Sequence, residues 1–435
     1  MRIGVVTTSF PRHRGDAAGH FVASGVELLR RRGHTVEVIA AGSATTPREE
    51  RTSDGYAPTS LDHAQAAVRE PSLRVTRLPS PLFYSGGAPE ALPRGGLGGA
   101  RAALSFSARL TITTLRRAAR WDAALAHWLA PSALAALPVR GPLLAIAHGG
   151  DVHLLRRAGL LPAALGLLLA RRARLVFVSA ELAALARRTA PPWLRPRFDE
   201  QTLVQPMGVD LAHFASQRQL HARPVAGPYA LVLARLVPLK GVALAVRALA
   251  LTRSDLTLVI AGDGPERAPL AELARPLGDR VRFVGELDAR ARDAHLAHAA
   301  ALLVPSRRLP DGRSEGTPLA ALEALACGVP VLATAVGGLP ELGAGVKLLG
   351  GDGGSLDEVA EPEVAARWAT ALDALVAAPP APRVLQQVAQ QFDWHRVAEA
   401  LWHHWMGAFA PHPPATLAAL PASPSAKVVT QQSPS

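Results

Sequence analysis

The sequence predicts an α/β protein with two domains, each built around a parallel β-sheet. Short apolar runs typical of buried strands alternate with helical patterns along both halves of the chain, as expected for parallel sheets. The length of 435 residues is also more than one ordinary domain requires. The predicted parts are an N-terminal domain at 1–222, a C-terminal domain at 223–392, a terminal helix at 393–409 and a disordered Pro-, Ala- and Ser-rich tail at 410–435.

Local patterns place the elements of the first domain. The opening strand passes into a helix through the loop SFPRHRGDAAGHF. Gly15 lies in this loop, where backbone N–H groups can approach an anion or a sugar, although a plain connecting loop is equally compatible with it. The loop is not a G-x-G-x-x-G motif, which weakens a dinucleotide-binding interpretation. Predicted elements are strands at 2–8, 36–40 and 73–78, a helix near 100–120, and irregular segments at 43–72 and 79–99.

The segment from Pro305 to Leu342 contains the main candidates for a binding site. A polar loop with Glu315 precedes a helix that Pro318 begins and Gly328 ends, and Glu323 lies within that helix. Eight helical residues would separate the two carboxylates by ~12 Å, more than the roughly 5–10 Å between the carboxylates of a glycosidase. We interpret them as two contacts along one extended ligand, whose phosphates would suit the free N–H groups at the helix start.

Charged and polar side chains follow other predicted strands. Arg235 and Lys240 are spaced to reach a diphosphate together, although Lys240 alone would also suit an exposed surface. His148 follows a buried strand, at the sheet edge where open α/β proteins bind ligands. Asp151 is expected to cap the next helix. His127 and His153 are interpreted as ordinary polar residues. The candidate glycines of the second domain are Gly262, Gly264, Gly316, Gly337 and Gly338.

Composition limits the classes of function. Cys327 is the only cysteine, which excludes an internal disulfide framework and a cysteine-rich metal site and fits a reducing compartment. We expect no signal peptide, and the longest apolar run, 160–170, is too short to span a bilayer. Most of the net charge of +12 lies in residues 1–222. Anionic lipid, an acidic substrate and nucleic acid therefore remain open as partners. The alternative is that arginine is simply the default cation of this chain, without a partner.

Several motifs resemble those of one known family. The sequences ARLVPLKG, GDGPER, PSRRLPDGRSEGTPLAALEALACGVPVLAT and QPMGVDLAHF, with SFPRHRGDAAGHF and AHGGDVH in the first half, resemble retaining glycosyltransferases of family 4. The most specific piece runs from Glu315 to Glu323 and on through GVPV. The resemblance covers roughly residues 2–409. It implies the GT-B architecture, in which two Rossmann-like domains face each other across a cleft and the terminal helix crosses back to the first domain. The loop RRLPDGRSEG is longer than the family's simplest form.

The resemblance implies a role for each candidate residue. Arg235 and Lys240 would bind the diphosphate of a nucleotide-sugar, a UDP- or GDP-sugar, and stabilise it as it leaves. Glu315 would hold hydroxyls of the donor sugar, Glu323 the nucleotide ribose, and His148 would lie beside the reacting sugar. No metal or other cofactor is implied, in line with the lack of a D-x-D motif. Further donor contacts are expected from Gly15, Gly264, Gly316, Thr317 and Leu319, with Asp16, Asp151 and Arg313 as additional candidates.

The expected function is therefore a retaining transfer of sugar to a glycan or lipid-linked acceptor, in polysaccharide or glycolipid biosynthesis. A nucleotide-sugar epimerase of similar fold is the alternative enzyme. A nucleic-acid-binding protein is the non-enzyme alternative, but the basic half has no aromatic stacking residues in basic context, and we expect no nucleic-acid partner. We expect a cytoplasmic enzyme whose arginine-rich helices near 100–120 and 153–174 contact the anionic inner face of the plasma membrane.

Overall fold

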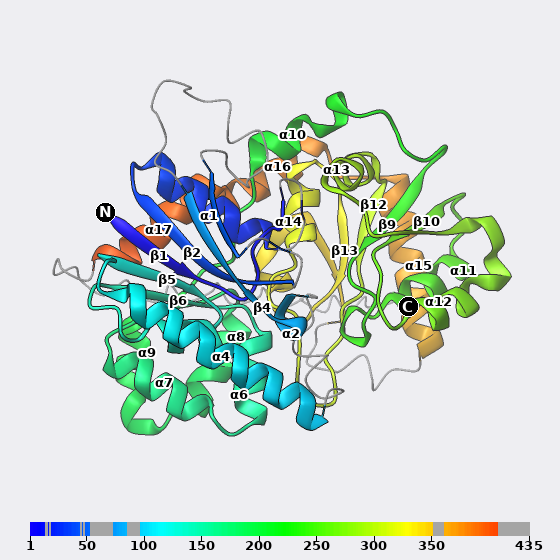
Figure 1. Ribbon diagram of the computed structural model, residues 1–435. Coiled ribbons are helices and arrows are strands. Elements are labelled where there is room, and N and C mark those ends of the chain that lie inside the picture. Colours follow the sequence, from blue (N-terminus) through cyan, green and yellow to red (C-terminus); the bar gives the residue numbers. More distant parts are fainter. Residues whose placement is uncertain are drawn as a thin grey trace, which may run out of the picture.

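The computed structural model describes residues 1–13, 16, 19–43, 46, 48–52, 73–84, 96–350 and 361–407. Two sheets with helices packed against them lie side by side (Figure 1). This arrangement confirms the predicted α/β class with two parallel sheets. The tail predicted at 410–435 lies outside the described residues, as do parts of the segments predicted to be irregular.

In the described part of the chain, the N-terminal sheet has eight strands in the order β3-β4-β2-β1-β5-β6-β7-β8. All of them pair in parallel except β3 (Glu49–Thr52), which runs antiparallel to β4 at the sheet edge. We predicted an irregular segment there, and β3 departs from that prediction. Its residues are polar and none of them is buried, so no apolar pattern marks this strand in the sequence. The other strands are β1 (Arg2–Val6), β2 (Thr35–Gly42), β4 (Leu73–Pro79), β5 (Ala123–His127), β6 (Leu143–Ala147), β7 (Arg174–Phe177) and β8 (Thr202–Val204).

The helices of this domain include one that begins earlier than its sequence predicts. α4 (Gly96–Ala118) starts within the Gly-rich segment GLGG, and Gly99 is buried there, so tertiary packing offsets the low helix propensity of glycine. The other helices and turns are α1 (His20–Arg31), α2 (Pro81–Tyr84), η2 (Leu129–Ala133), α5 (Leu134–Ala136), α6 (Gly150–Arg157), α7 (Leu161–Ala170), α8 (Ala180–Thr189), η3 (Pro192–Leu194) and α9 (Arg195–Gln201). The next helix, α10 (Leu211–Leu220), packs against the second domain, where Phe214 joins the core.

The second sheet has six parallel strands among the described residues, in the order β11-β10-β9-β12-β13-β14. Side chains alternate between its faces, so Ala230 and Val232 join one apolar cluster and Leu231 joins another. The edge strand β14 was not among the predicted strands, and only its first residue is buried. The strands are β9 (Tyr229–Leu233), β10 (Thr257–Ala261), β11 (Val281–Gly285), β12 (Ala301–Val304), β13 (Val331–Thr334) and β14 (Val346–Leu349).

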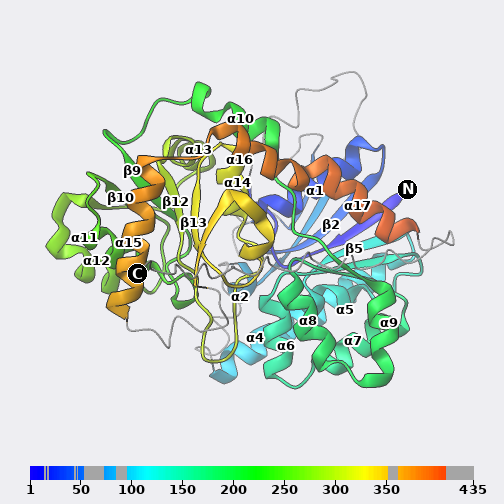
Figure 2. The same ribbon diagram turned by 180° about the vertical axis from the view of Figure 1, so that it is seen from behind.

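The helices of the second half cover this sheet and then return to the first domain. They are η4 (Pro238–Lys240), α11 (Val242–Leu251), α12 (Arg267–Ala274), η5 (Arg275–Arg280), α13 (Ala289–His298), α14 (Leu319–Ala326), η6 (Leu339–Gly345), α15 (Glu361–Ala377), α16 (Pro382–Ala389), η7 (Gln390–Phe392) and α17 (Trp394–Met406). α17 lies against the first domain (Figure 2), and Trp394, Val397, Leu401 and Trp405 are part of that domain's core.

No single helix in the described ranges is long and apolar enough to cross a membrane. α6 and α7 reach that length and hydropathy only as a pair, and the pair is bent by 117°.

Candidate active site between the two domains

The loop of residues 314–318, which we call the donor loop, lies against the first domain. The hydroxyl of Thr317 donates a hydrogen bond to the carbonyl oxygen of Val178 at 2.6 Å, and the Ser314 hydroxyl donates to Glu181 Oε1 at 2.8 Å. At Gly316, a Cβ atom would lie 3.1 Å from the carbonyl oxygen of His148. The structure thus brings the predicted donor loop and the predicted His148 together, although they come from different domains.

Lys240 and Glu315 form an ion pair in the second domain. Lys240 Nζ lies 2.6 Å from Glu315 Oε1, and the two side chains are 21% and 9% exposed. The Ser306 hydroxyl also donates a hydrogen bond to Glu315. Gly241, in the left-handed conformation, allows the turn after Lys240, because a Cβ there would lie 2.1 Å from the carbonyl oxygen of Pro305. Lys240 is therefore part of a partly buried pair and not a residue of the open surface.

Glu323 is buried within α14 and contacts two cationic or polar side chains. His20 Nε2 lies 3.1 Å from Glu323 Oε1, and an Arg292 nitrogen lies 3.6 Å from the same oxygen. Burial raises the pKa of Glu323, but the charge of Arg292 and the hydrogen bond from His20 lower it to about 2. Glu323 is therefore ionised at neutral pH and can accept hydrogen bonds from ligand hydroxyls.

We did not predict His20 and Arg292 as partners of this carboxylate. His20 lies at the end of a motif that we singled out, so its place near a ligand could have been inferred. Arg292 lies on α13, whose sequence resembles an ordinary exposed helix, yet its side chain is buried and held by Asp293 at 2.8 Å. No local signal in the sequence indicates that contact.

His148 follows β6 and pairs with a second histidine. Its Nε2 lies 2.9 Å from Nδ1 of His127, and the ring of Phe21 lies 5.0 Å from its own ring. Burial lowers the pKa of His127 to about 3, and burial together with His127 lowers the pKa of His148 well below its ordinary value. Both rings are therefore neutral near pH 7. His127, which we interpreted as an ordinary polar residue, orients His148.

Asp151 does not cap α6, contrary to our prediction. Gly149 occupies the capping position and Asp151 lies in the first helical turn. Its buried carboxylate accepts hydrogen bonds from the backbone N–H groups of Leu129, His148 and Gly149, at 2.6, 3.2 and 3.1 Å. These three bonds bend the chain back on itself, so Asp151 positions the segment that carries His148.

The remaining predicted residues make contacts of several other kinds. Arg313 pairs with Asp311 at 2.9 Å, in a loop whose Asp311 carbonyl oxygen accepts a hydrogen bond from Arg156 of the first domain. Asp16 pairs with Arg12. A Cβ at Gly264 would lie 2.4 Å from the carbonyl oxygen of Leu236, so this glycine allows two loops to approach closely. Arg235 is exposed in the loop after β9, and Gly15 lies outside the described residues.

The start of α14 presents free donors, as we expected. α14 begins at Leu319, one residue later than predicted, with Pro318 preceding it. Within the described ranges, no hydrogen-bond acceptor pairs with the backbone N–H groups of Gly316, Thr317 or Leu319. Unpaired N–H groups at a helix start favour an anion.

The fold is that of the GT-B class. Sucrose-phosphate synthase from Thermosynechococcus elongatus is similar with a TM-score of 0.62 and 21% identity, covering 94% of this chain and 99% of that chain. Anabaena Alr3699/HepE in complex with UDP-glucose is similar with a TM-score of 0.60 and 20% identity, covering 92% and 98%. At this level of identity the likeness establishes the fold alone.

Residues 214–352 match the family of glycosyl transferases group 1. D-inositol 3-phosphate glycosyltransferase of Mycolicibacterium gilvum is 37% identical over 224 residues, which are 47% of this chain and 46% of that protein. GDP-mannose-dependent alpha-(1-6)-phosphatidylinositol monomannoside mannosyltransferase of Mycolicibacterium smegmatis is 38% identical over 148 residues, covering 31% and 39%. The chain thus matches less than half the length of these curated relatives.

Proposed function

We propose that the protein is a retaining glycosyltransferase that takes its sugar from a nucleotide-sugar. One observation carries this proposal: Glu315 of the donor loop pairs with Lys240, and His148 of the other domain lies against the same loop. A cation for phosphate, a carboxylate for sugar hydroxyls and free N–H donors therefore converge on one place. The match to glycosyl transferases group 1 supports the same assignment.

The chemistry follows from the charges of these groups. Negative charge grows on the diphosphate as the bond to the sugar breaks, and Lys240 and Arg235 would stabilise it. Ionised Glu323 would accept hydrogen bonds from the ribose hydroxyls, and Glu315 from those of the sugar. His148, which is neutral, would position the reacting sugar without gaining a charge. A phosphate oxygen would take the proton of the acceptor, and fixed cations replace a metal ion at the diphosphate.

The donor and the acceptor are proposed from chemistry and from the relatives. Similar proteins are described with UDP-glucose or as GDP-mannose-dependent, so a UDP- or GDP-sugar is the donor class. The relatives named for inositol 3-phosphate and phosphatidylinositol monomannoside favour an acceptor that is a phosphorylated polyol or a glycolipid carrying one. We place this reaction in glycolipid or surface polysaccharide biosynthesis in the cytoplasm.

An exposed stripe on α4 favours a lipid-linked acceptor. Leu97, Leu104, Ile112 and Leu115 are between 48% and 84% exposed, while Phe106 and Leu110 face the core. Arg101, Arg109 and Arg116 are exposed on the same helix. α4 runs along the outside of the first domain (Figure 1). Apolar and basic side chains exposed together suit the interface of an anionic membrane, where each cation near the surface contributes about 1 kcal/mol.

Incubation with UDP- and GDP-sugars, with inositol phosphate or phosphatidylinositol as acceptor, tests the proposal. Nuclear magnetic resonance of the product should show the anomeric configuration of the donor. An epimerase would instead convert the donor to its epimer without any acceptor. In co-sedimentation with vesicles of phosphatidylglycerol and phosphatidylcholine, binding should weaken as salt rises and should fall when Leu104 and Leu115 are replaced by Ser. No binding at low salt would contradict the membrane contact.

A further inference from the structure

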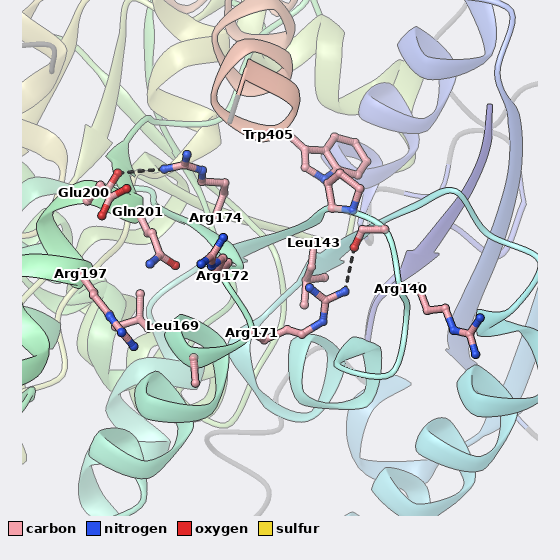
Figure 3. A pocket seen from close by; sticks show the side chains of 13 residues that line it. Arg140, Leu143, Leu169, Arg171, Arg172, Arg174, Arg197, Glu200, Gln201 and Trp405 are labelled. Atoms are coloured by element: carbon pink, nitrogen blue, oxygen red, sulfur yellow. Dashed lines mark hydrogen bonds between the residues drawn. The ribbon is translucent and has the colours of Figure 1, made fainter. Parts of the chain in front are cut away.

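A cavity lies on the first domain, away from the donor loop. It has a volume of about 630 Å³ and is lined by the turn before β6, the end of α7, the start of β7, α9 and Trp405 of α17 (Figure 3). It lies at the amino ends of β6 and β7, whereas His148 follows the carboxyl end of β6. Five residues of strand separate the two places by ~16 Å.

The cavity is strongly cationic. Arg174 donates a hydrogen bond to the backbone carbonyl oxygen of Glu200 at 3.0 Å, and Arg171 donates to the carbonyl oxygens of Leu137, Val139 and Gly141. These hydrogen bonds occupy N–H groups of the two arginines, but a neutral carbonyl group does not balance the positive charge of a guanidinium. The lining arginines are Arg140, Arg171, Arg172, Arg174 and Arg197. Glu200 is the acidic residue of the lining, and among the described residues no carboxylate forms an ion pair with any of these arginines.

The sequence after α17 contains no acidic residue that could balance the charge of these arginines. Trp405 lies near the end of α17, and the sequence that follows, 408–435, contains neither Asp nor Glu. This segment therefore brings no side-chain carboxylate to the arginines. The arginines of the lining therefore suit an anion from outside the chain.

Two buried polar groups in the lining have no hydrogen-bond partner. Gln201 is 7% exposed and its Oε1 is unpaired, and Trp405 is 2% exposed and its Nε1 is unpaired. Buried polar atoms are nearly always paired, so each of these indicates a missing partner. Oε1 needs a donor and Nε1 needs an acceptor, and a hydroxyl group can supply either. Figure 3 shows the amide of Gln201 between the guanidinium groups of Arg172 and Arg197.

The backbone at Arg172 supports a role for its side chain. Its φ is 57°, the left-handed region, at the residue after the C-cap of α7. Glycine is the usual residue at that position because it adopts this conformation without strain. Arg197 and Gln201 are four residues apart on α9 and therefore lie on one face of that helix.

We propose that this cavity binds a phosphorylated sugar or polyol from solution, at a site separate from the donor site. The arginines match the oxygens of a phosphate dianion, and the ligand hydroxyls match Gln201 Oε1 and Trp405 Nε1. The volume lies within the roughly 300–1,000 Å³ of small-molecule sites. The ligand would contact both the first domain and α17, the helix that returns from the second domain.

Isothermal titration of the full chain with glucose 6-phosphate tests this proposal. The variant Arg172→Ala/Arg197→Ala should bind at least tenfold more weakly, whereas a control with two exposed arginines elsewhere, Arg188→Ala/Arg290→Ala, should bind as the parent does. Lys240→Ala should also retain binding. Absence of binding to the parent, equal binding by the cavity variant, or loss of binding in Lys240→Ala would each overturn the proposal.

A second variant tests the hydroxyl contacts and does not depend on the arginines. Gln201→Leu should weaken the binding of glucose 6-phosphate and leave the binding of inorganic phosphate unchanged. Equal affinity of the parent for these two probes would overturn the assignment of a sugar or polyol. A phospholipid headgroup is the other source of phosphate. Co-sedimentation with phosphatidylglycerol vesicles that is lost in Arg172→Ala/Arg197→Ala, without any binding of glucose 6-phosphate, would overturn the assignment of a soluble ligand.

Discussion

His20 of the first domain and Glu323 of the second are in contact across the domain interface, with His20 Nε2 3.1 Å from Glu323 Oε1. The two residues are 303 positions apart in the sequence. In the proposed function Glu323 holds the ribose of the donor. This contact therefore couples donor binding to the relative position of the two domains.

Replacing His20 by Ala should weaken donor binding. Glu323 would lose its partner in the first domain and keep Arg292, so we expect KM for the nucleotide-sugar to rise about tenfold, the effect of losing one hydrogen bond to a charged group. His403→Ala is the matched control, because that side chain is 79% exposed on α17. Steady-state kinetics measure both variants, and an unchanged KM in folded His20→Ala protein would contradict the coupling.

The stability of the protein should depend on pH through Glu323. The pKa of Glu323 is about 2 in the folded state against 4.5 when unperturbed. The stabilisation, on the order of 3 kcal/mol, is therefore complete above pH 4.5 and is lost as the pH falls toward 2. Urea unfolding at several pH values measures this. Glu323→Gln should be less stable at neutral pH and lose less stability on acidification; parallel curves for the two proteins would refute the assignment.

Lys240→Ala and Glu315→Gln should each abolish most of the turnover. Removing one group that stabilises charge in a transition state typically costs 10²–10³ or more in kcat, about 3–4 kcal/mol. Lys347 is an exposed lysine of the same domain, and Lys347→Ala should retain full activity. Thermal unfolding would establish that each variant is folded. Normal turnover of folded Lys240→Ala protein would remove the phosphate role.

Activity should persist in the presence of a chelator. Arg235 and Lys240 would supply the positive charge that a divalent ion supplies in other transferases. The measurement compares initial rates with and without EDTA, after dialysis of the protein against the same chelator. A strict requirement for Mg²⁺ or Mn²⁺ would argue against charge stabilisation by these two residues alone.

Gly337→Ala should lower both stability and activity. Gly337 has φ 61°, and a Cβ there would lie 2.1 Å from the carbonyl oxygen of Glu315. Gly159, at the end of α6, has φ 69° and nothing within 4 Å of its Cβ position, so Gly159→Ala carries only the backbone strain of the left-handed conformation, roughly 1–2 kcal/mol, without the clash. The Tm and kcat should therefore both fall further in Gly337→Ala. Equal effects in the two variants would show that contact with Glu315 is unimportant.

The sequence by itself determined the fold class and the segments that carry candidate residues. Strands and helices can be predicted from short segments, because the spacing of apolar residues within one segment indicates its secondary structure. The strands at 2–8, 36–40 and 73–78 and the helix after Glu315 were predicted for this reason. The roles of Arg235, Lys240, Glu315 and Glu323 toward a donor remain predictions.

The tertiary structure alone decided which side chains meet. The contacts of Glu323 with His20 and Arg292, and of His148 with His127, join residues that no local pattern links. Asp151 shows the same limit: its sequence predicts a helix cap, but its carboxylate reaches back to Leu129. Such contacts depend on how the two domains and their helices pack, and packing is set by many distant residues together and by no single segment.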